Sequence, residues 1–269
     1  MSEQTISNKK LTIRVGRDSL SFTTTDIANR EQPIVYQPYI VKSGVSMAAN
    51  LREAFKTTDI LSSGIRRVRV LIDGPVLLVP VEQFLEAEEG LLFRHAFPSD
   101  SQLTVGHNVM PTLNAVAVFG INKDLLMVVN DRFDDVQLIY AASPVWNYLH
   151  QRSFTGHRNK LYAYFFDKRV GIFSFHKNRF KFCNVFDASQ GHDALYFMLY
   201  VWKQLNLQPE HDEMHLVGDI PEKEWLLEEL RLYLQNAYII NPSAEFNREP
   251  ATQIAGMPFD LMTLFTKGR

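Results

Sequence analysis

The sequence lacks most of the features that assign a chain to a specialised class of protein. It has one cysteine, Cys183, so no disulfide can form within its 269 residues, which favours a reducing cytosol. No run approaches the ~20 apolar residues of a membrane-spanning helix, and residues 1–10 contain no apolar core of a signal peptide. The net charge of −2 argues against nucleic acid or an anionic membrane surface as a partner. We therefore expect a cytoplasmic protein that is not inserted in a membrane.

What is present is enough apolar material for two domains. Hydrophobic residues make up 46% of the chain and aromatic residues 12%, so a large core can form and disorder of the whole chain is excluded. Two stretches share one design, because residues 11–41 and 161–183 each alternate apolar and polar residues in three short runs with polar turns between them. A helical pattern follows each trio. The repetition predicts two similar α/β lobes with a cleft between them.

The order of elements in each half is strand trio, helix, strand, helix, strand, which is typical of an actin-like half-domain with a mixed sheet and helices on its faces. The polar stretch 153–160 is the clearest linker. The predicted organisation is a disordered tail (1–9), a first lobe (10–154) with an inserted subdomain (around 74–130), and a second lobe (155–269) whose last helix (259–266) packs back on the first lobe.

The chain resembles a known group of proteins from residue 113 to its end. Residues 115–126, 136–146, 161–182 and 216–222 look like successive elements of the actin-like assembly proteins of type IV pili and of the bacterial division ring. Within that superfamily the chain most resembles an uncharacterised bacterial domain family with an actin-like ATPase fold. The resemblance implies a duplicated, ribonuclease H-like, two-lobed fold. It also implies a bacterial protein with a protein partner or self-association.

The loops that hold nucleotide in the resembled family are altered here. ATP-using members carry Asp-x-Gly followed by Ser or Thr in the first hairpin, whereas this chain has Arg14 where the aspartate belongs and Gly16 where the glycine belongs. The second hairpin, residues 164–169, has no glycine. Residues that match the family's nucleotide loops, and that we interpret as a vestigial cofactor site, are Gly16, Asp18, Ser19, Gly218 and Asp219.

Two hypotheses for the function follow. The first is a non-enzymatic scaffold or protein-interaction protein, a pseudo-ATPase with no cofactor, no catalytic residue and no metal. The second is a nucleotide-binding protein of the actin-like ATPase superfamily with weak or no hydrolysis. Degradation of both phosphate hairpins favours the first hypothesis, because phosphate chemistry needs an acid to hold the metal and a backbone that can wrap the phosphate.

Other candidate chemistry is weaker. His211 and His215 have the i, i+4 spacing of a helical zinc motif, but the stretch leads into a strand, where the two rings lie too far apart for one metal. Cys183 could be a nucleophile with His176 or His192, yet its alternating strand favours a buried structural thiol.

Surface features allow two further interpretations. Arg66, Arg67 and Arg69 form a basic strand edge that is either solvated or an anion patch, and Asp131, Asp134 and Asp135 fit a solvated loop.

Residues 219–222 predict a helix capping box, and Pro80 predicts the start of a helix. Trp202 belongs to the apolar stripe of one helix. For Tyr196 and Tyr200 the core is the favoured position, and the alternative is a second, partly exposed face of the helix that contacts a partner or a second copy.

Overall fold

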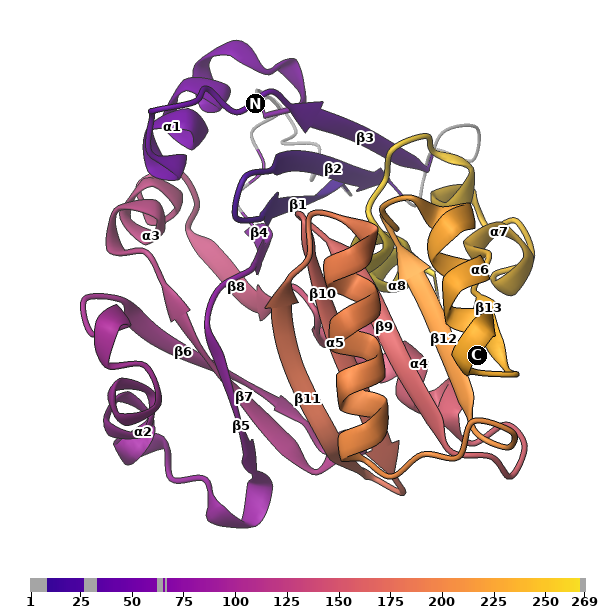
Figure 1. The fold of residues 1–269 in the computed structure, drawn as a ribbon. Helices are drawn as coiled ribbons and strands as arrows, with labels where there is room; N and C mark the ends of the chain where they lie inside the picture. The colour runs from indigo at the N-terminus through magenta and orange to yellow at the C-terminus, as the bar shows by residue number, and fades with distance from the viewer. Residues whose placement is uncertain (1–8, 27–32, 62–64, 66, 267–269) are drawn as a thin grey trace, which may run out of the picture. The chain divides into compact units, whose positions relative to one another are not determined.

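A computed structural model of the chain describes residues 9–26, 33–61, 65 and 67–266 (Figure 1). Its contacts divide the chain into two compact units, Met1–Pro111 with Ala115–Ser143 and Thr112–Asn114 with Pro144–Arg269. Residues 1–8 of the predicted tail lie outside the described residues, whereas Lys9 already belongs to a strand. Within the described ranges, no helix combines the length and the apolar character that crossing a bilayer requires.

The first unit is built on a five-stranded mixed sheet in the order β3-β2-β1-β4-β8. Its strands are β1 (Lys9–Val15), β2 (Leu20–Asp26), β3 (Ile34–Tyr39), β4 (Arg67–Ile72) and β8 (Asp135–Tyr140). Two helices, α1 (Met47–Thr57) and α3 (Lys123–Asn130), pack against each other. Alternation of apolar residues explains the buried face, where Ile13, Phe22 and Val70 have no exposed surface.

An inserted three-stranded antiparallel sheet in the same unit has the order β5-β7-β6. Its elements are β5 (Val76–Pro80), α2 (Glu89–Ala96), β6 (Thr104–Met110) and β7 (Ala115–Ile121). The Asn108 side chain ties this sheet to β8, because its Nδ2 donates to Leu138 O at 3.0 Å and its Oδ1 accepts from Tyr140 N at 2.7 Å. Asn108 thus supplies the two hydrogen bonds that a neighbouring strand would give to β8.

The prediction that Pro80 opens a helix is wrong, because Pro80 ends β5 and only short 3-10 turns follow it. The short 3-10 helices of the chain are η1 (Asp59–Leu61), η2 (Val81–Gln83), η3 (Glu86–Glu88), η4 (Pro98–Asp100), η5 (Pro111–Leu113) and η6 (Pro250–Gln253).

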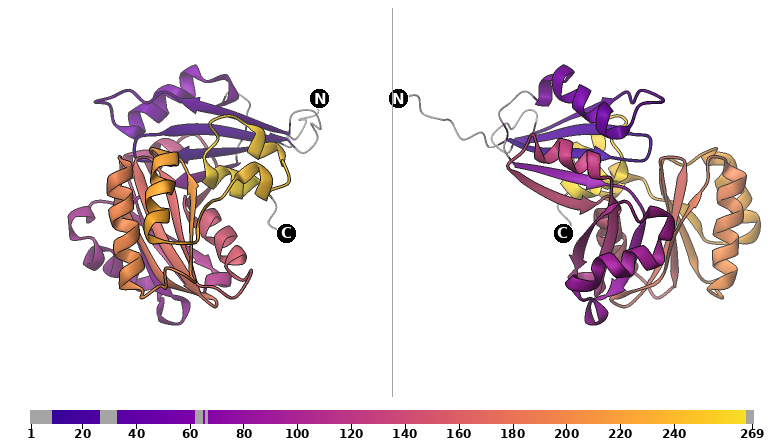
Figure 2. Two further views of the ribbon diagram at one scale, coloured as in Figure 1. Left: turned by 45° about the vertical axis from the view of Figure 1, so that its right-hand side comes forward. Right: turned by 90° about the vertical axis from the view of Figure 1, so that its left-hand side faces the viewer.

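The second unit is built on a sheet in the order β11-β10-β9-β12-β13. Its strands are β9 (Lys160–Phe166), β10 (Arg169–His176), β11 (Arg179–Asp187), β12 (Glu213–Gly218) and β13 (Ala237–Ile239). Its helices are α4 (Ser143–Ser153), α5 (Gly191–Gln204), α6 (Lys223–Tyr233), α7 (Pro242–Glu245) and α8 (Phe259–Phe265). Helices α5 and α6 cover one face of this sheet through a core that includes Leu161, Met198 and Leu226 (Figure 2).

The two five-stranded sheets have the same topology, since each is an antiparallel trio extended by two parallel strands. Each trio turns directly after its first strand, through residues 16–19 in one unit and through residues 167 and 168 in the other. The prediction of a duplicated α/β fold with mixed sheets and helices on their faces is therefore confirmed.

The predicted capping box before α6 is wrong. Helix α6 begins at Lys223, and Glu222 precedes it with φ of +46° and makes no capping hydrogen bond from its side chain. The Glu222 carboxylate instead lies close to Gly191 in the first turn of α5. A carboxylate near a helix N-terminus interacts favourably with the helix dipole. Glu222 therefore stabilises the N-terminus of α5 and does not cap its own helix.

The last helix, α8, is anchored by aromatic contacts. The Phe259 ring lies 5.9 Å from that of Tyr148 in α4 and 6.1 Å from that of Tyr164 in β9. Helix α4 belongs to the predicted first lobe, whereas the contacts of the chain group it with the second unit. Packing of α8 on the rest of the predicted first lobe stays a prediction.

Candidate functional site

The turn between β1 and β2 holds three of the predicted site residues. Gly16 N donates to Ser19 O at 2.8 Å and closes the turn, which places Asp18 at its exposed tip. Arg14, 3% exposed, projects from the end of β1, and its Nη1 donates to Ser19 Oγ at 2.6 Å. The turn thus places a buried cation beside Gly16, Asp18 and Ser19.

The turn between β9 and β10 occupies the corresponding place in the second unit but has a different backbone conformation. Asp167 and Lys168 have φ values of +44° and +58°, as a two-residue hairpin with the right twist requires. Arg169 lies over the Phe166 ring, with its Cζ 4.8 Å from the ring centroid. The turn therefore adopts the left-handed conformation without glycine and carries a side chain at both central positions.

Gly218 and Asp219 lie beside the end of β9. Gly218 has φ of +101°, and a Cβ built on it would lie 2.1 Å from the carbonyl oxygen of Phe165. Asp219 N donates to that same oxygen at 3.0 Å. Gly218 is thus required by the close approach of two backbones, whatever the loop binds.

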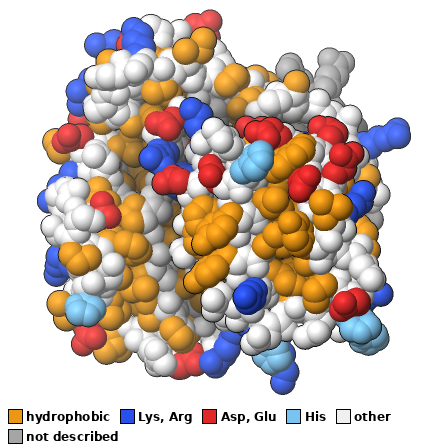
Figure 3. Space-filling view, viewed as in Figure 1, with side chains coloured by type: hydrophobic (Ala, Val, Ile, Leu, Met, Phe, Trp, Pro, Cys, Tyr) orange, Lys and Arg blue, Asp and Glu red, His pale blue; other side chains and the backbone are white. Residues whose placement is uncertain are grey.

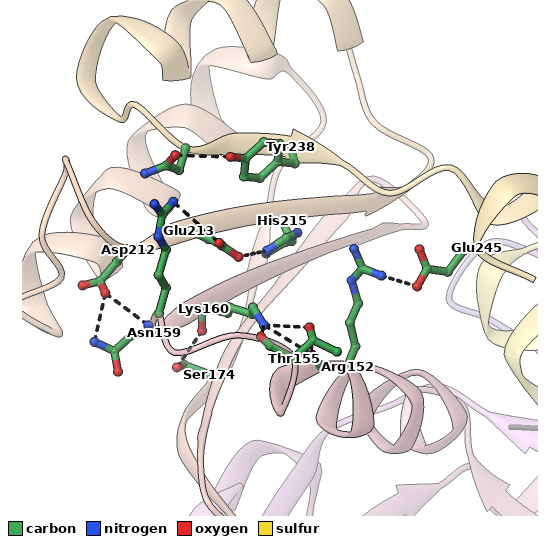
Figure 4. Close-up of polar contacts among 12 residues, drawn as sticks. Arg152, Thr155, Asn159, Lys160, Ser174, Asp212, Glu213, His215, Tyr238 and Glu245 are labelled. Carbon is green, nitrogen blue, oxygen red and sulfur yellow. Dashed lines mark hydrogen bonds and ion pairs between the residues drawn. The ribbon is translucent and has the colours of Figure 1, made fainter. Parts of the chain in front are cut away.

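A second group of polar residues, which the sequence analysis did not find, lies in the second unit on the sheet face opposite α5 and α6 (Figure 4). Four rings from neighbouring strands form a row across this face. Phe173 stacks on Tyr162 at 5.9 Å, Tyr162 on His215 at 5.5 Å, and His215 lies 5.5 Å from Tyr238. The strand register aligns these four residues, so the row follows from the sequence alternation within each strand.

Charged side chains surround the row. His215 Nε2 lies 2.9 Å from Glu213 Oε2, and Arg152 of α4 forms an ion pair with Glu245 of α7. Lys160, paired with Glu213 across the parallel strands, donates to Thr155 Oγ1 at 3.0 Å. We call Arg152, Lys160, Tyr162, Glu213, His215 and Glu245 the polar centre.

Burial is the largest cause of the pKa shifts in the polar centre. It lowers the pKa of His215, although the hydrogen bond to Glu213 acts in the opposite direction. It also lowers the pKa of Lys160 and raises that of Tyr162. The Tyr162 hydroxyl and His215 Nδ1 are buried without a hydrogen-bond partner, which suits ordered water. The centre links α4, β9, β12 and α7.

The structure argues against the nucleophile and the metal site that the sequence offered as weaker candidates. Cys183 lies in β11, opposite Phe173 of β10. Burial raises the pKa of its thiol to about 12, so the thiol is unreactive at neutral pH. The His192 ring lies 4.2 Å from the Trp225 ring, with the two planes inclined by 30°. Within the described residues, no group of three His, Cys, Asp or Glu side chains could hold a metal ion.

The predicted surface features are also accounted for. Arg67 forms an exposed ion pair with Asp135 at 2.5 Å, and Arg69 Nε lies 3.4 Å from Gln137 Oε1, while Arg66 lies outside the described residues. The solvated-edge interpretation therefore fits Arg67. Tyr196 and Tyr200 are exposed, so the favoured core interpretation is wrong for them and the alternative of a second, exposed face of α5 holds.

Alternation could have revealed the polar centre. Lys160 and Tyr162 in β9, and Glu213 and His215 in β12, occupy alternate positions of otherwise apolar strands. Polar residues on one face of a buried strand predict a partner network on that face. Arg152 and Glu245 could not have been added from the sequence, because they lie 93 residues apart on separate helices.

Comparison with known proteins confirms that the predicted fold is actin-like. A crystal structure from Bacteroides thetaiotaomicron, described as a protein with actin-like ATPase fold and unknown function, is 30% identical, with a TM-score of 0.80 over 90% of this chain and 95% of that one. The PilM–PilN type IV pilus biogenesis complex is 12% identical, with a TM-score of 0.57 over 97% of this chain and 99% of that one. No curated protein matches the chain.

A family model described as "Protein of unknown function (DUF3822)" matches residues 1–237. The match spans most of both units and includes the two hairpin turns, Gly218 and all of the polar centre except Glu245. On this match, the chain belongs to the DUF3822 family.

Proposed function

We propose that this protein acts by binding another protein, as a non-enzymatic member of the actin-like superfamily. The observation that carries the proposal is Arg14, whose buried guanidinium holds Ser19 in the first turn. The resemblance places a metal-holding aspartate at this position in ATP-using proteins. A buried cation repels a divalent metal, and its charge cannot be removed because arginine stays protonated in proteins.

The second turn supports the same conclusion. Lys168 is exposed, and Asp167 brings a carboxylate to the stretch where the resembled family wraps phosphate in backbone amides. A carboxylate beside phosphate is repulsive unless a metal lies between them. Since Arg14 stands where a metal-holding acid is needed, both turns favour loss of hydrolysis.

Protein binding is supported by the similarity to a protein that is known in a complex. The PilM–PilN structure is by its name an assembly of two proteins. The similarity to it extends over 97% of the present chain. A net charge of −2 supports a protein rather than a nucleic acid as the partner, and the single cysteine supports a cytoplasmic setting.

Phosphate release with purified protein and Mg-ATP tests the loss of hydrolysis. We expect no turnover by the wild-type chain and none by Arg14→Asp, because the second turn still lacks glycine. Arg17→Asp is the matched control, since it places the same charge at an exposed position of the same turn. Turnover by the wild-type chain that disappears in Asp18→Ala or Ser19→Ala would show that the first turn is catalytic.

Binding of nucleotide without hydrolysis is the second candidate. It is favoured by the guanidinium of Arg14, which could contact a phosphate directly. A ligand present at 100 times its Kd stabilises a protein by about 2.7 kcal/mol, which a thermal melt detects. Stabilisation by Mg-ATP that is lost in Arg14→Gln would establish this candidate, and unchanged melting at millimolar Mg-ATP would exclude it.

A further inference from the structure

Two tyrosines form an exposed stack on the outer side of α5. Tyr196 is 62% exposed and Tyr200 is 48% exposed, and their rings lie 6.1 Å apart with planes inclined by only 16°. Figure 3 shows hydrophobic side chains gathered over this helix. The two tyrosines do not belong to the core, because α5 faces the core through Ala194, Met198 and Val201.

An acidic corner adjoins this stack at the N-terminal ends of α5 and α6. Asp193 precedes Tyr196 by three residues, so the two side chains are neighbours on the helix surface. His192 stacks on Trp225 and joins the two helices, and the Glu222 carboxylate lies beside Gly191. The exposed acids of this corner are Asp193, Glu222 and Glu224, against one exposed base, Lys223.

We propose that Asp193, Tyr196, Tyr200, Glu222 and Glu224, together called the α5–α6 stripe, bind a basic, partly apolar segment of a partner protein. The inference rests on the proposed protein-binding function and names the chemistry of the partner. Tyrosine is enriched in protein interfaces, and an arginine or lysine is attracted to the face of its ring. The carboxylates of the corner add attraction for the same cations.

The charge of the stripe decides among the possible occupants. Two copies of the chain meeting through this stripe would bring together only carboxylates and tyrosines, so neither copy would supply the cation that both kinds of side chain attract. An acidic peptide or a nucleic acid would be repelled by the carboxylates. A basic segment is the occupant that both the tyrosine faces and the carboxylates favour.

The test measures fluorescence anisotropy with synthetic amphipathic peptides of about 15 residues, which is about four helical turns. One peptide combines Arg and Leu at helical spacing. A second replaces Arg by Glu, and a third keeps Arg but replaces Leu by Ser. We expect the Arg/Leu peptide to bind the full chain more tightly than either of the others, with an affinity that falls as salt increases.

Variants locate the binding. Tyr196→Ser with Tyr200→Ser should weaken binding of the Arg/Leu peptide by about tenfold or more, as expected for interface aromatics. Asp193→Asn with Glu222→Gln should weaken it by about threefold to tenfold and reduce its salt dependence. Tyr233→Ser is the matched control, since Tyr233 is 57% exposed on α6 outside the stripe, and it should leave the Kd within about twofold.

Several results would overturn the inference. They are equal binding of the Glu/Leu peptide, equal loss in Tyr233→Ser, or no binding of the Arg/Leu peptide at low salt. A dimer in light scattering that dissociates in the double tyrosine variant would identify a second copy as the occupant. Phosphate release is measured separately, so ATP turnover would contradict the proposed function without deciding the occupant of the stripe.

Discussion

Gly218 meets the carbonyl oxygen of Phe165 so closely that a Cβ at this position would lie 2.1 Å from it. The contact places the end of β12 against the last residues of β9, directly before the turn to β10. The left-handed φ of +101° adds a second reason for glycine, because side chains disfavour that conformation. This pair of residues fixes the loop that contains Asp219.

We predict that Gly218→Ala destabilises the protein by more than about 2 kcal/mol, because both the backbone strain and the contact with Phe165 O act against the new methyl group. The measurement is the free energy of unfolding from urea titration. Gly256→Ala is the matched control, since Gly256 has φ of +73° but no atom within 4 Å of the added Cβ. It should cost only about 1 kcal/mol. Equal losses in both variants would contradict the role of the contact.

We predict that His215, which stacks on Tyr162, makes the stability of the protein depend on pH. Burial lowers the pKa of His215 in the folded protein, so the unfolded chain binds its proton more readily. The stability that neutral His215 contributes is therefore complete above the ordinary pKa of about 6.5 and is lost as pH falls below it. Glu213, Arg152 and Lys160 are the charged groups that act on this ring.

We expect the wild-type chain to lose more stability than His215→Gln between pH 7.5 and pH 5.5, because the variant has no imidazole to protonate. Urea unfolding at both pH values measures the difference. The comparison cancels the contributions of the other histidines, which both proteins share. A variant that loses as much stability as the wild type on acidification would show that His215 does not titrate in this range.

The two similar halves were predictable because strand alternation is a local property. Leu11, Ile13 and Val15 mark the buried face of β1 by spacing alone. Strand β6 was not predictable in this way, since Gly106, His107 and Asn108 interrupt its apolar pattern. Its pairing with β7 decides its conformation, because strand formation depends more on the neighbouring strand than on the intrinsic preference of the residues.

Only those residues of the candidate site that are neighbours in the sequence could be predicted. The first turn brings Gly16, Asp18 and Ser19 together because they are neighbours in the sequence. The cap that was wrongly predicted at Glu222 depends instead on residues that are far apart in the sequence. The Glu222 carboxylate lies at the N-terminus of α5, which begins about thirty residues earlier. A local motif carries no information about such a tertiary partner.

Arg152 and Glu245 join α4 to α7 at a partly buried position, with side chains 27% and 26% exposed. We predict a coupling energy of about 1–3 kcal/mol in a double-mutant cycle of Arg152→Ala and Glu245→Ala, because each single variant leaves a partly buried charge unpaired. The exposed pair Lys42–Glu53 is the control, since its side chains are 56% and 39% exposed. Its coupling should be about 0.5 kcal/mol or less. Equal coupling in both pairs would show that burial does not strengthen the α4–α7 contact.

Helix α8 is short, yet its side chains are among the best buried at the end of the chain. Phe259 and Leu261 are 4% and 0% exposed, and Tyr164 Oη lies 3.2 Å from Asp260 Oδ2. Burial of two large apolar side chains contributes about 3–6 kcal/mol. We therefore predict that deletion of residues 257–269 lowers the melting temperature of the protein by about 6 °C or more, a shift that scanning calorimetry resolves. Deletion of residues 267–269 alone removes none of these contacts and serves as the control. If the longer deletion melts at the temperature of the control, α8 is not part of the core.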